Sequence, residues 1–292
     1  MQPLTRSAII PLIKAALRED RARHDLTSRA VLPPDTRIRA RIIAKAPSIL
    51  AGGPVAGWVF QALDPSLRCR LAAKEGSRLE PNQTILIVEG PPRSILTAER
   101  TALNLLGHLS GIATLTREYV RRTRGTRAKI LDTRKTLPGL RALEKYAVRA
   151  GGGHNHRGNL SEAILIKTSH LNALGNGKRQ TGNVVQRAIA QAKHAWPKHV
   201  VEVEVTGMAE FRAALIAQPD AILLDNWRLA DIHRAVQRVP RSPFPVPLIE
   251  VSGGITLANV RAYAKTGVDR ISIGRLTHSA PSLDVSLQVI NG

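Results

Sequence analysis

The chain has 292 residues, 43% hydrophobic and 22% charged, a globular composition that excludes a disordered or collagen-like chain. Its single cysteine, Cys69, excludes an intramolecular disulfide and a cysteine-based zinc site, and it predicts a reducing compartment, the cytoplasm. The 43 Lys and Arg residues outnumber the 22 Asp and Glu residues, and this formal charge of +21 makes nucleic-acid binding a first hypothesis.

The first third of the chain predicts a mixed α+β structure. The pattern predicts an amphipathic helix over 7–19, strands over 38–44 and 84–89, and a long helix with Thr97 as its N-cap and Glu99 in its first turn. The small residues that would let another backbone approach this long helix closely are Gly107, Ser110, Gly111 and Ala113.

The longest uncharged stretch, residues 46–63, reaches the lower length limit of a membrane span. Because Pro47, Gly52, Gly53 and Pro54 interrupt it, it predicts instead a short strand, a tight turn and the start of a helix. No small-residue cleavage site follows the short uncharged run at 7–13, so we expect no secretory signal.

From about residue 128, strand-like runs alternate with helical patterns. The runs are residues 128–133, 163–168, 200–205, 221–226, 247–254 and 270–274, and the helical patterns are residues 183–196, 208–218, 229–239 and 256–267. Strands that alternate with helices form parallel sheets, and six or more such units indicate an α/β barrel.

Polar residues lie in or at the ends of most of these runs: Asp132, Lys167, Glu202, Glu204, Asp225, Glu250 and Ser252. Strands of a parallel sheet are usually apolar throughout, and the carboxyl ends of barrel strands build active sites. The sequence therefore predicts an active site at these strand ends.

Three groups of residues suggest its chemistry. Glycine turns at 252–255 and 272–275 predict a phosphate site, because glycine lets backbone N–H groups approach phosphate oxygens. The cations Arg134, Lys135, His156, Arg157, Lys167 and His170 suit a ligand with several carboxylates or phosphates, although surface basicity is the alternative for each of them. The carboxylates Glu202, Glu204 and Asp225 suit Mg²⁺, ribose hydroxyls, a developing cation or proton transfer, or else structural salt bridges.

Several segments resemble the quinolinate phosphoribosyltransferase family. They read HDLTSRAVLP, AERTALNLLGHLSGIAT, DTRKTLPGLRALEKYAVRAGGGHNHR, LSEAILIK, VEVEV, ILLDN, EVSGGI and DRISIGRLTHS, in the order of the family's own motifs. The resemblance implies an N-terminal α/β sandwich domain over 1–111, joined by residues 276–292, and an open, seven-stranded, TIM-like α/β barrel over 112–275. It also implies a homodimer, or a larger assembly, in which the neighbouring subunit completes each active site.

The resemblance implies a reaction as well. Quinolinate and 5-phosphoribosyl-1-pyrophosphate would give nicotinate mononucleotide, pyrophosphate and CO2, a step of NAD biosynthesis. Mg²⁺ would arrive mainly with the pyrophosphate, with Glu202 and Asp225 as candidate protein ligands. The implied catalytic residues are Lys135, Lys167, Glu202 and Asp225, and Lys135 is the candidate proton donor. The implied substrate-binding residues are these four together with Arg100 from the neighbouring subunit, Thr133, Arg134, His156, Arg157, Ser252, Gly253, Gly254, Ser272, Ile273 and Gly274.

Some residues depart from the family pattern. Thr168 and Ser169 stand where many relatives have an acidic residue and Asn, and Asn159 replaces a common glycine. Ser161 and Glu162 resemble a diverged subgroup associated with molybdenum transport, which is one alternative. An inactive paralogue and a nucleic-acid-binding protein are the others, the last disfavoured by only three residues each of Phe, Trp and Tyr.

Overall fold

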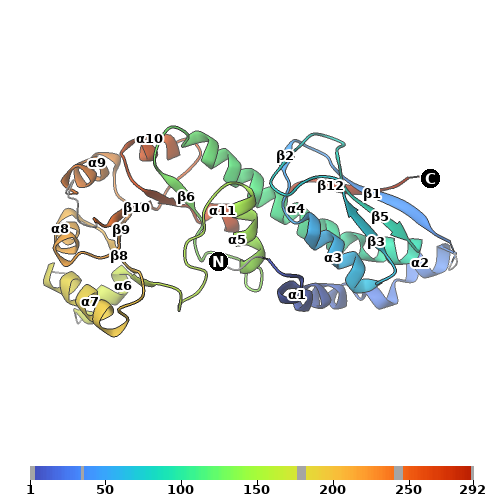
Figure 1. Ribbon diagram of the computed structural model, residues 1–292, viewed down its shortest axis with the longest axis horizontal. Coiled ribbons are helices and arrows are strands. Elements are labelled where there is room, and N and C mark those ends of the chain that lie inside the picture. The colour runs from blue at the N-terminus through green and yellow to red at the C-terminus, as the bar shows by residue number, and fades with distance from the viewer. Residues whose placement is uncertain (1–3, 34–35, 176–181, 240–245, 291–292) are drawn as a thin grey trace. The chain divides into compact units, whose positions relative to one another are not determined.

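The computed structural model describes residues 4–33, 36–175, 182–239 and 246–290 (Figure 1). The chain divides into two compact units. We call the first the sheet unit; it comprises Met1–Arg117, Thr136–Gly152 and Arg275–Gly292. We call the second the barrel unit; it comprises Glu118–Lys135 and Gly153–Gly274. The domain boundary predicted between residues 111 and 112 stays a prediction.

The sheet unit contains a four-stranded antiparallel sheet in the order β12-β1-β5-β3. Its strands are β1 (Ile38–Ala44), β3 (Arg68–Leu71), β5 (Thr84–Gly90) and β12 (Val285–Ile290). The helices that lie wholly in this unit are α1 (Arg6–Glu19), α2 (Leu26–Val31), α3 (Gly53–Leu63), α5 (Arg141–Ala150) and α11 (Arg275–His278), with the 3-10 helix η1 (Ala22–His24). Helix α3 packs on β3 and β5, and α1 packs on α3.

The predicted helix over 7–19 and the predicted strands over 38–44 and 84–89 are confirmed. The uncharged stretch at 46–63 forms β2 (Ser48–Ile49), which pairs with β4 (Arg78–Leu79), then a turn, then α3. Gly52 in that turn has φ of 94°, a left-handed conformation that favours glycine. No helix among the described residues is both long enough and apolar enough to cross a membrane.

The predicted start of the long helix at Thr97 is wrong. Helix α4 (Pro92–Arg122) begins at Pro92, where proline is tolerated because the first N–H groups of a helix have no partner within it. The Thr97 hydroxyl instead donates to Asp25 Oδ2 at 2.7 Å. Asp25 is itself the N-cap of α2 and accepts the Ser28 N–H at 3.0 Å, so Thr97 supports the cap of another helix.

The small residues of α4 do admit another backbone segment, as predicted. A Cβ added to Gly107 would lie 2.7 Å from the Leu283 carbonyl oxygen, and one added to Gly111 would overlap the Pro281 carbonyl oxygen. Ser110 Oγ bonds both the N–H and the C=O of Ala51, each at 3.1 Å. The segment that leads into β12 therefore packs directly on the backbone of α4.

This packing predicts that Gly111→Ala lowers the free energy of unfolding by about 2–3 kcal/mol, because the new methyl group overpacks a site closed by backbone atoms. The midpoint of urea unfolding measures the loss. The control is Gly207→Ala, since Gly207 has φ of −159° and an added Cβ would meet no atom within 4 Å. Equal midpoints for the two variants would contradict the close approach.

The barrel unit contains a parallel sheet in the order β6-β11-β10-β9-β8-β7. Its strands are β6 (Lys129–Leu131), β7 (Ile164–Ile166), β8 (Val201–Val205), β9 (Ala221–Asp225), β10 (Leu248–Ser252) and β11 (Arg270–Ser272). Its helices include α6 (Thr168–Leu174), α7 (Gly182–Ala195), α8 (Met208–Ala217), α9 (Leu229–Arg238) and α10 (Val260–Lys265). Helices α7, α8 and α9 lie along one side of this sheet (Figure 1).

All six predicted strand runs of this half are confirmed, and the α/β barrel class with them. Where seven strands were expected, six are found in the described part of the chain, and His154 makes a single parallel bridge to Leu131 beside β6. The strands bury apolar side chains almost throughout. Lys129 and Leu248, at the starts of β6 and β10, are exposed. The polar residues Glu202 and Glu250 are buried among the apolar side chains.

Candidate active site

The two glycine turns lie side by side because their strands pair in register. Ser252 at the end of β10 is opposite Ser272 at the end of β11, and on its other side it is opposite Asp225 at the end of β9. Gly253 has φ of 92°, and an added Cβ would overlap the Asn226 side-chain amide. The predicted phosphate turns and the predicted carboxylate Asp225 therefore meet at one edge of the sheet.

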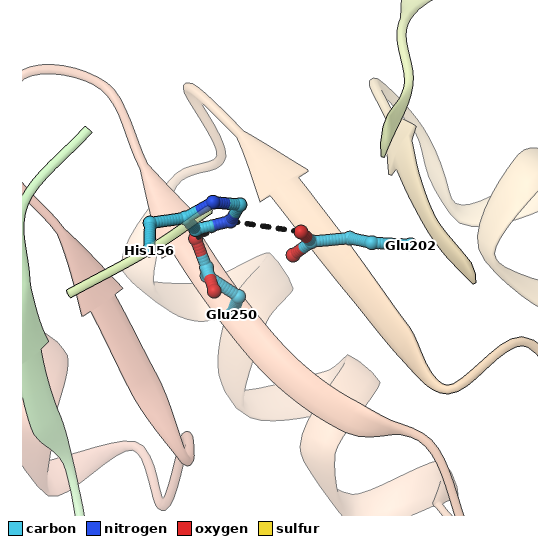
Figure 2. Close-up of side chains that lie close together, drawn as sticks. All are labelled: His156, Glu202 and Glu250. Atoms are coloured by element: carbon cyan, nitrogen blue, oxygen red, sulfur yellow. Dashed lines mark hydrogen bonds and ion pairs between the residues drawn. The ribbon is translucent and has the colours of Figure 1, made fainter. Parts of the chain in front are cut away.

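A buried polar cluster lies within the barrel unit, formed by His156, Glu202 and Glu250 from three separate segments (Figure 2). His156 Nε2 is 2.9 Å from Glu202 Oε2 and 3.5 Å from Glu250 Oε1. Glu202 is 3% exposed and Glu250 is 0% exposed, so both carboxyl groups are removed from water. We call these three residues the His156 cluster.

The hydrogen bonds assign the protons of the imidazole. The Arg157 N–H donates to His156 Nδ1 at 2.8 Å, so Nδ1 carries no proton. The ring proton therefore lies on Nε2, which donates it to Glu202. A protonated Nε2 has no lone pair for a metal ion. For that reason we assign no metal to the His156 cluster, although its three ligand atoms lie within 4.8 Å of one another.

Two further contacts fix this part of the chain. Asp132, fully buried after β6, accepts the His156 N–H at 2.9 Å and also the side-chain amide of Asn155. Burial, and next the negative charge of Glu202, raise the pKa of Glu250 to about 8. Both effects favour the neutral form of the Glu250 carboxyl group.

A second pair of carboxylates, Glu204 and Asp225, is less deeply buried. The pKa of Asp225 is raised, first by burial and then by the charge of Glu204, while Lys135 and Lys167 act to lower it. The charges of Glu204, Lys135 and Lys167 therefore all act on Asp225, at the carboxyl end of β9. The arrangement provides two oxygen-donor side chains and two cations, which suits a Mg²⁺-bound polyphosphate.

Lys167 precedes α6, where the sequence departs from the family pattern, and other residues support it there. Glu204 Oε1 accepts the Thr168 N–H at 3.1 Å and the Thr168 hydroxyl at 2.7 Å. His170 Nδ1 accepts the Lys167 N–H at 2.9 Å. Thr168 therefore replaces the missing carboxylate by bonding to one on β8, and the first turn of α6 stays anchored.

Two of the predicted arginines, Arg134 and Arg157, lie close enough for their charges to interact. The pKa of Arg157 is lowered by burial first and then by the nearby positive charge of Arg134, while Glu202 acts to raise it. Arg157 Nη1 donates to the Ala163 carbonyl at 2.9 Å, which restrains its guanidinium. The Thr133 hydroxyl accepts the Lys135 N–H at 3.0 Å and shapes the turn after β6. Arg100 lies exposed on α4 in the sheet unit.

Sequence reasoning placed Glu202 and Glu204 on one face of the same strand, because strand side chains alternate. In the structure the two side chains differ in burial and in their partners. Glu202 is buried and hydrogen-bonded to His156, whereas Glu204 is half-buried and its charge acts on Asp225. For Asp132 and Glu250 the sequence shows only a polar residue in or after an apolar strand. That polarity was the available signal, but it did not identify their partners.

Comparison with known proteins is consistent along the whole chain. Residues 25–110 match the family model described as quinolinate phosphoribosyl transferase, N-terminal domain, and residues 112–288 match the model of the C-terminal domain. The chain is 43% identical over 280 residues to a nicotinate-nucleotide pyrophosphorylase [carboxylating] of Mycobacterium leprae, covering 95% of each chain. It is 40% identical over 272 residues to a probable enzyme of that name from Bacillus subtilis, covering 93% of this chain and 90% of the relative.

Solved structures agree with the sequence comparisons. The chain superimposes on NadC from Streptococcus pyogenes with a TM-score of 0.89 and 40% identity, covering 100% of both chains. It superimposes on a nicotinate-nucleotide pyrophosphorylase from Francisella tularensis with a TM-score of 0.89 and 38% identity, covering 99% of this chain and 98% of that one. The resemblance noted in the sequence is confirmed, and the chain belongs to the quinolinate phosphoribosyltransferase family.

Proposed function

We propose that this protein transfers the phosphoribosyl group of 5-phosphoribosyl-1-pyrophosphate to quinolinate and decarboxylates the adduct, giving nicotinate mononucleotide, pyrophosphate and CO2 for NAD biosynthesis. The observation that carries the proposal is the gathering of two glycine turns, cations and carboxylates at the carboxyl ends of one parallel sheet. In an α/β barrel this is where active sites form. The family membership and the names of the relatives support the same reaction.

In this proposal the arginines bind the dicarboxylate. Arg134 and Arg157 act on one another electrostatically, and two such cations favour a ligand with two neighbouring anionic groups. His156 presents its ring beside Arg157. The turns at Ser252, Gly253 and Gly254 and at Ser272, Ile273 and Gly274 bind the 5-phosphate through backbone N–H groups.

The chemistry then needs two charge-stabilising steps. The pyridine nitrogen forms a bond to C1 of the ribose while the bond from C1 to pyrophosphate breaks, and nearby carboxylates stabilise the positive charge that develops on the sugar. Lys167 offsets the charge that collects on the departing pyrophosphate. The bond from C2 to its carboxylate then breaks and CO2 departs. The electron pair stays on C2, where the adjacent positive charge of the quaternised ring nitrogen stabilises it, and Lys135 supplies the proton to C2.

The residues present fit a magnesium ion that arrives with the substrate. Glu204 and Asp225 provide hard oxygen donors at the strand ends, and Mg²⁺ typically uses one or two carboxylates together with substrate phosphates. Mg²⁺ supplies charge neutralisation on pyrophosphate when it is bound. Glu202, the ligand expected from the sequence, is buried against His156, so the geometry favours Glu204 for this role.

The test is direct. Purified protein with quinolinate, 5-phosphoribosyl-1-pyrophosphate and Mg²⁺ is expected to release CO2 and form nicotinate mononucleotide, and an excess of EDTA is expected to abolish turnover. Folded protein that releases no CO2 under these conditions would refute the proposal. The family models and the named relatives support neither the molybdenum-associated subgroup nor a nucleic-acid-binding protein.

The proposal includes a cytoplasmic homodimer in which Arg100 completes the active site of the neighbouring subunit. It predicts that Arg100→Ala and Lys167→Ala, each inactive alone, regain about one quarter of wild-type activity when unfolded and refolded together, because half of the dimers are mixed and each mixed dimer has one intact site. Activity assays on equimolar mixtures measure this. Refolded dimers without regained activity would place Arg100 outside the neighbour's site.

A further inference from the structure

Glu250 is a fully buried carboxyl group to which the proposed reaction assigns no role. It lies on β10, two residues before the turn at Ser252, and is 0% exposed. Burial of a carboxyl group inside a parallel sheet costs free energy unless hydrogen bonds compensate for lost water. An apolar residue would fill this position at lower cost, so a glutamate here indicates a specific task.

The contacts of Glu250 connect the two substrate regions. Ser272 Oγ donates to Glu250 Oε1, and Ser272 begins the second phosphate turn. The same oxygen lies 3.5 Å from His156 Nε2, on the side where quinolinate is proposed to bind. One carboxyl oxygen is thus shared between a residue of the 5-phosphate turns and a residue of the quinolinate site.

His156 in turn determines the position of Arg157. The imidazole accepts the Arg157 N–H at Nδ1 and donates from Nε2 to Glu202 at 2.9 Å. Glu250 is the second carboxyl group facing Nε2, so together with Glu202 it limits rotation of the ring (Figure 2). A displaced ring would move the backbone of Arg157 because the two are hydrogen-bonded.

We propose that Glu250 is a positioning residue for quinolinate, which holds the His156 ring and thereby the Arg157 backbone in register with the phosphate turn at Ser272. The inference rests on the proposed function for the identity of the ligand. It assigns Glu250 no contact with substrate and no transfer of a proton. Its role is to keep two parts of one site at a fixed separation.

Burial and the charge of Glu202 raise the pKa of Glu250, which favours its neutral form. A neutral side chain of the same shape is therefore expected to preserve quinolinate binding. Glutamine is such a replacement, because it keeps the shape of the side chain and an oxygen that can accept the Ser272 hydroxyl. Alanine removes both the acceptor and the volume. The comparison of Gln with Ala therefore separates hydrogen-bonded positioning from a need for negative charge.

The experiment compares Glu250→Gln and Glu250→Ala in the full-length protein by quinolinate titration in a calorimeter and by steady-state kinetics. We expect Ala to weaken quinolinate binding and raise its KM about tenfold or more, as removal of a supporting hydrogen-bond partner does, and Gln to stay within about threefold of wild type. The control is Glu118→Gln, an exposed ion-pair partner of Arg121 in the same unit, which should leave all constants unchanged.

Several results would overturn the inference. A folded Ala variant with wild-type quinolinate binding would do so, and so would a Gln variant as impaired as Ala. If Ala does not fold, Ser272→Ala removes the donor to Glu250 with little loss of volume and should shift the quinolinate KM in the same direction. Wild-type protein that binds quinolinate without converting it would refute the proposed function, while the binding titrations would still decide the role of Glu250.

Discussion

Replacing Arg157 by Ala is expected to raise the KM for quinolinate about 100-fold or more while changing the KM for 5-phosphoribosyl-1-pyrophosphate only slightly. Removing one partner of a buried charged hydrogen bond costs about 2–5 kcal/mol, and only quinolinate loses such a partner here. Arg157 is partly buried near Arg134, and its guanidinium donates a hydrogen bond to the Ala163 carbonyl, which restrains its position.

Two further variants make this prediction specific. Arg157→Lys should recover little of the loss, because a lysine cannot form the paired, planar hydrogen bonds that a guanidinium makes with a carboxylate. Arg228→Ala removes an arginine whose side chain is 86% exposed in the same unit, and it should behave as wild type. Equal losses for both substrates in Arg157→Ala would contradict the assignment of Arg157 to quinolinate.

Glu204→Gln is expected to lower kcat about 100- to 1,000-fold, the cost typical of removing one group that stabilises charge in the transition state. The amide oxygen of glutamine can still accept the two hydrogen bonds from Thr168, so the variant removes charge with little change of structure. The concentration of Mg²⁺ needed for half-maximal activity should rise as well, since one oxygen donor is weakened.

The matched variant is Glu202→Gln, which changes the neighbouring carboxylate of the same strand. Because Glu202 is bonded to His156 and is 3% exposed, its replacement should lower kcat by less than about tenfold and leave the Mg²⁺ requirement unchanged. Steady-state kinetics at varied Mg²⁺ concentration distinguishes the two. The reverse order of effects would restore Glu202 as the carboxylate nearest the ribose and the metal ion.

Local pattern was sufficient for most of the fold. The alternation of apolar strands with amphipathic helices predicted β6 to β11, and the spacing of Gly107 and Gly111 predicted the close approach of another segment to α4. These features depend on neighbours in the sequence, through side-chain periodicity and the space around a glycine. The start of α4 at Pro92 escaped prediction because Thr97 bonds to Asp25, which lies 72 residues away in the chain.

By itself the sequence predicted the residue types of the candidate site: its glycine turns, its cations and its carboxylates, most of them within a strand or shortly after one. Only the tertiary structure decided which partners each carboxylate contacts. Strand alternation gives the face on which Glu202 and Glu204 lie but not their partners. Glu202 is hydrogen-bonded to His156, whereas Glu204 is hydrogen-bonded to Thr168 and its charge acts on Asp225. The proton on His156 Nε2 and the support of Lys167 by His170 and, through Thr168, by Glu204 were likewise decided by hydrogen bonds that form only once the chain has folded.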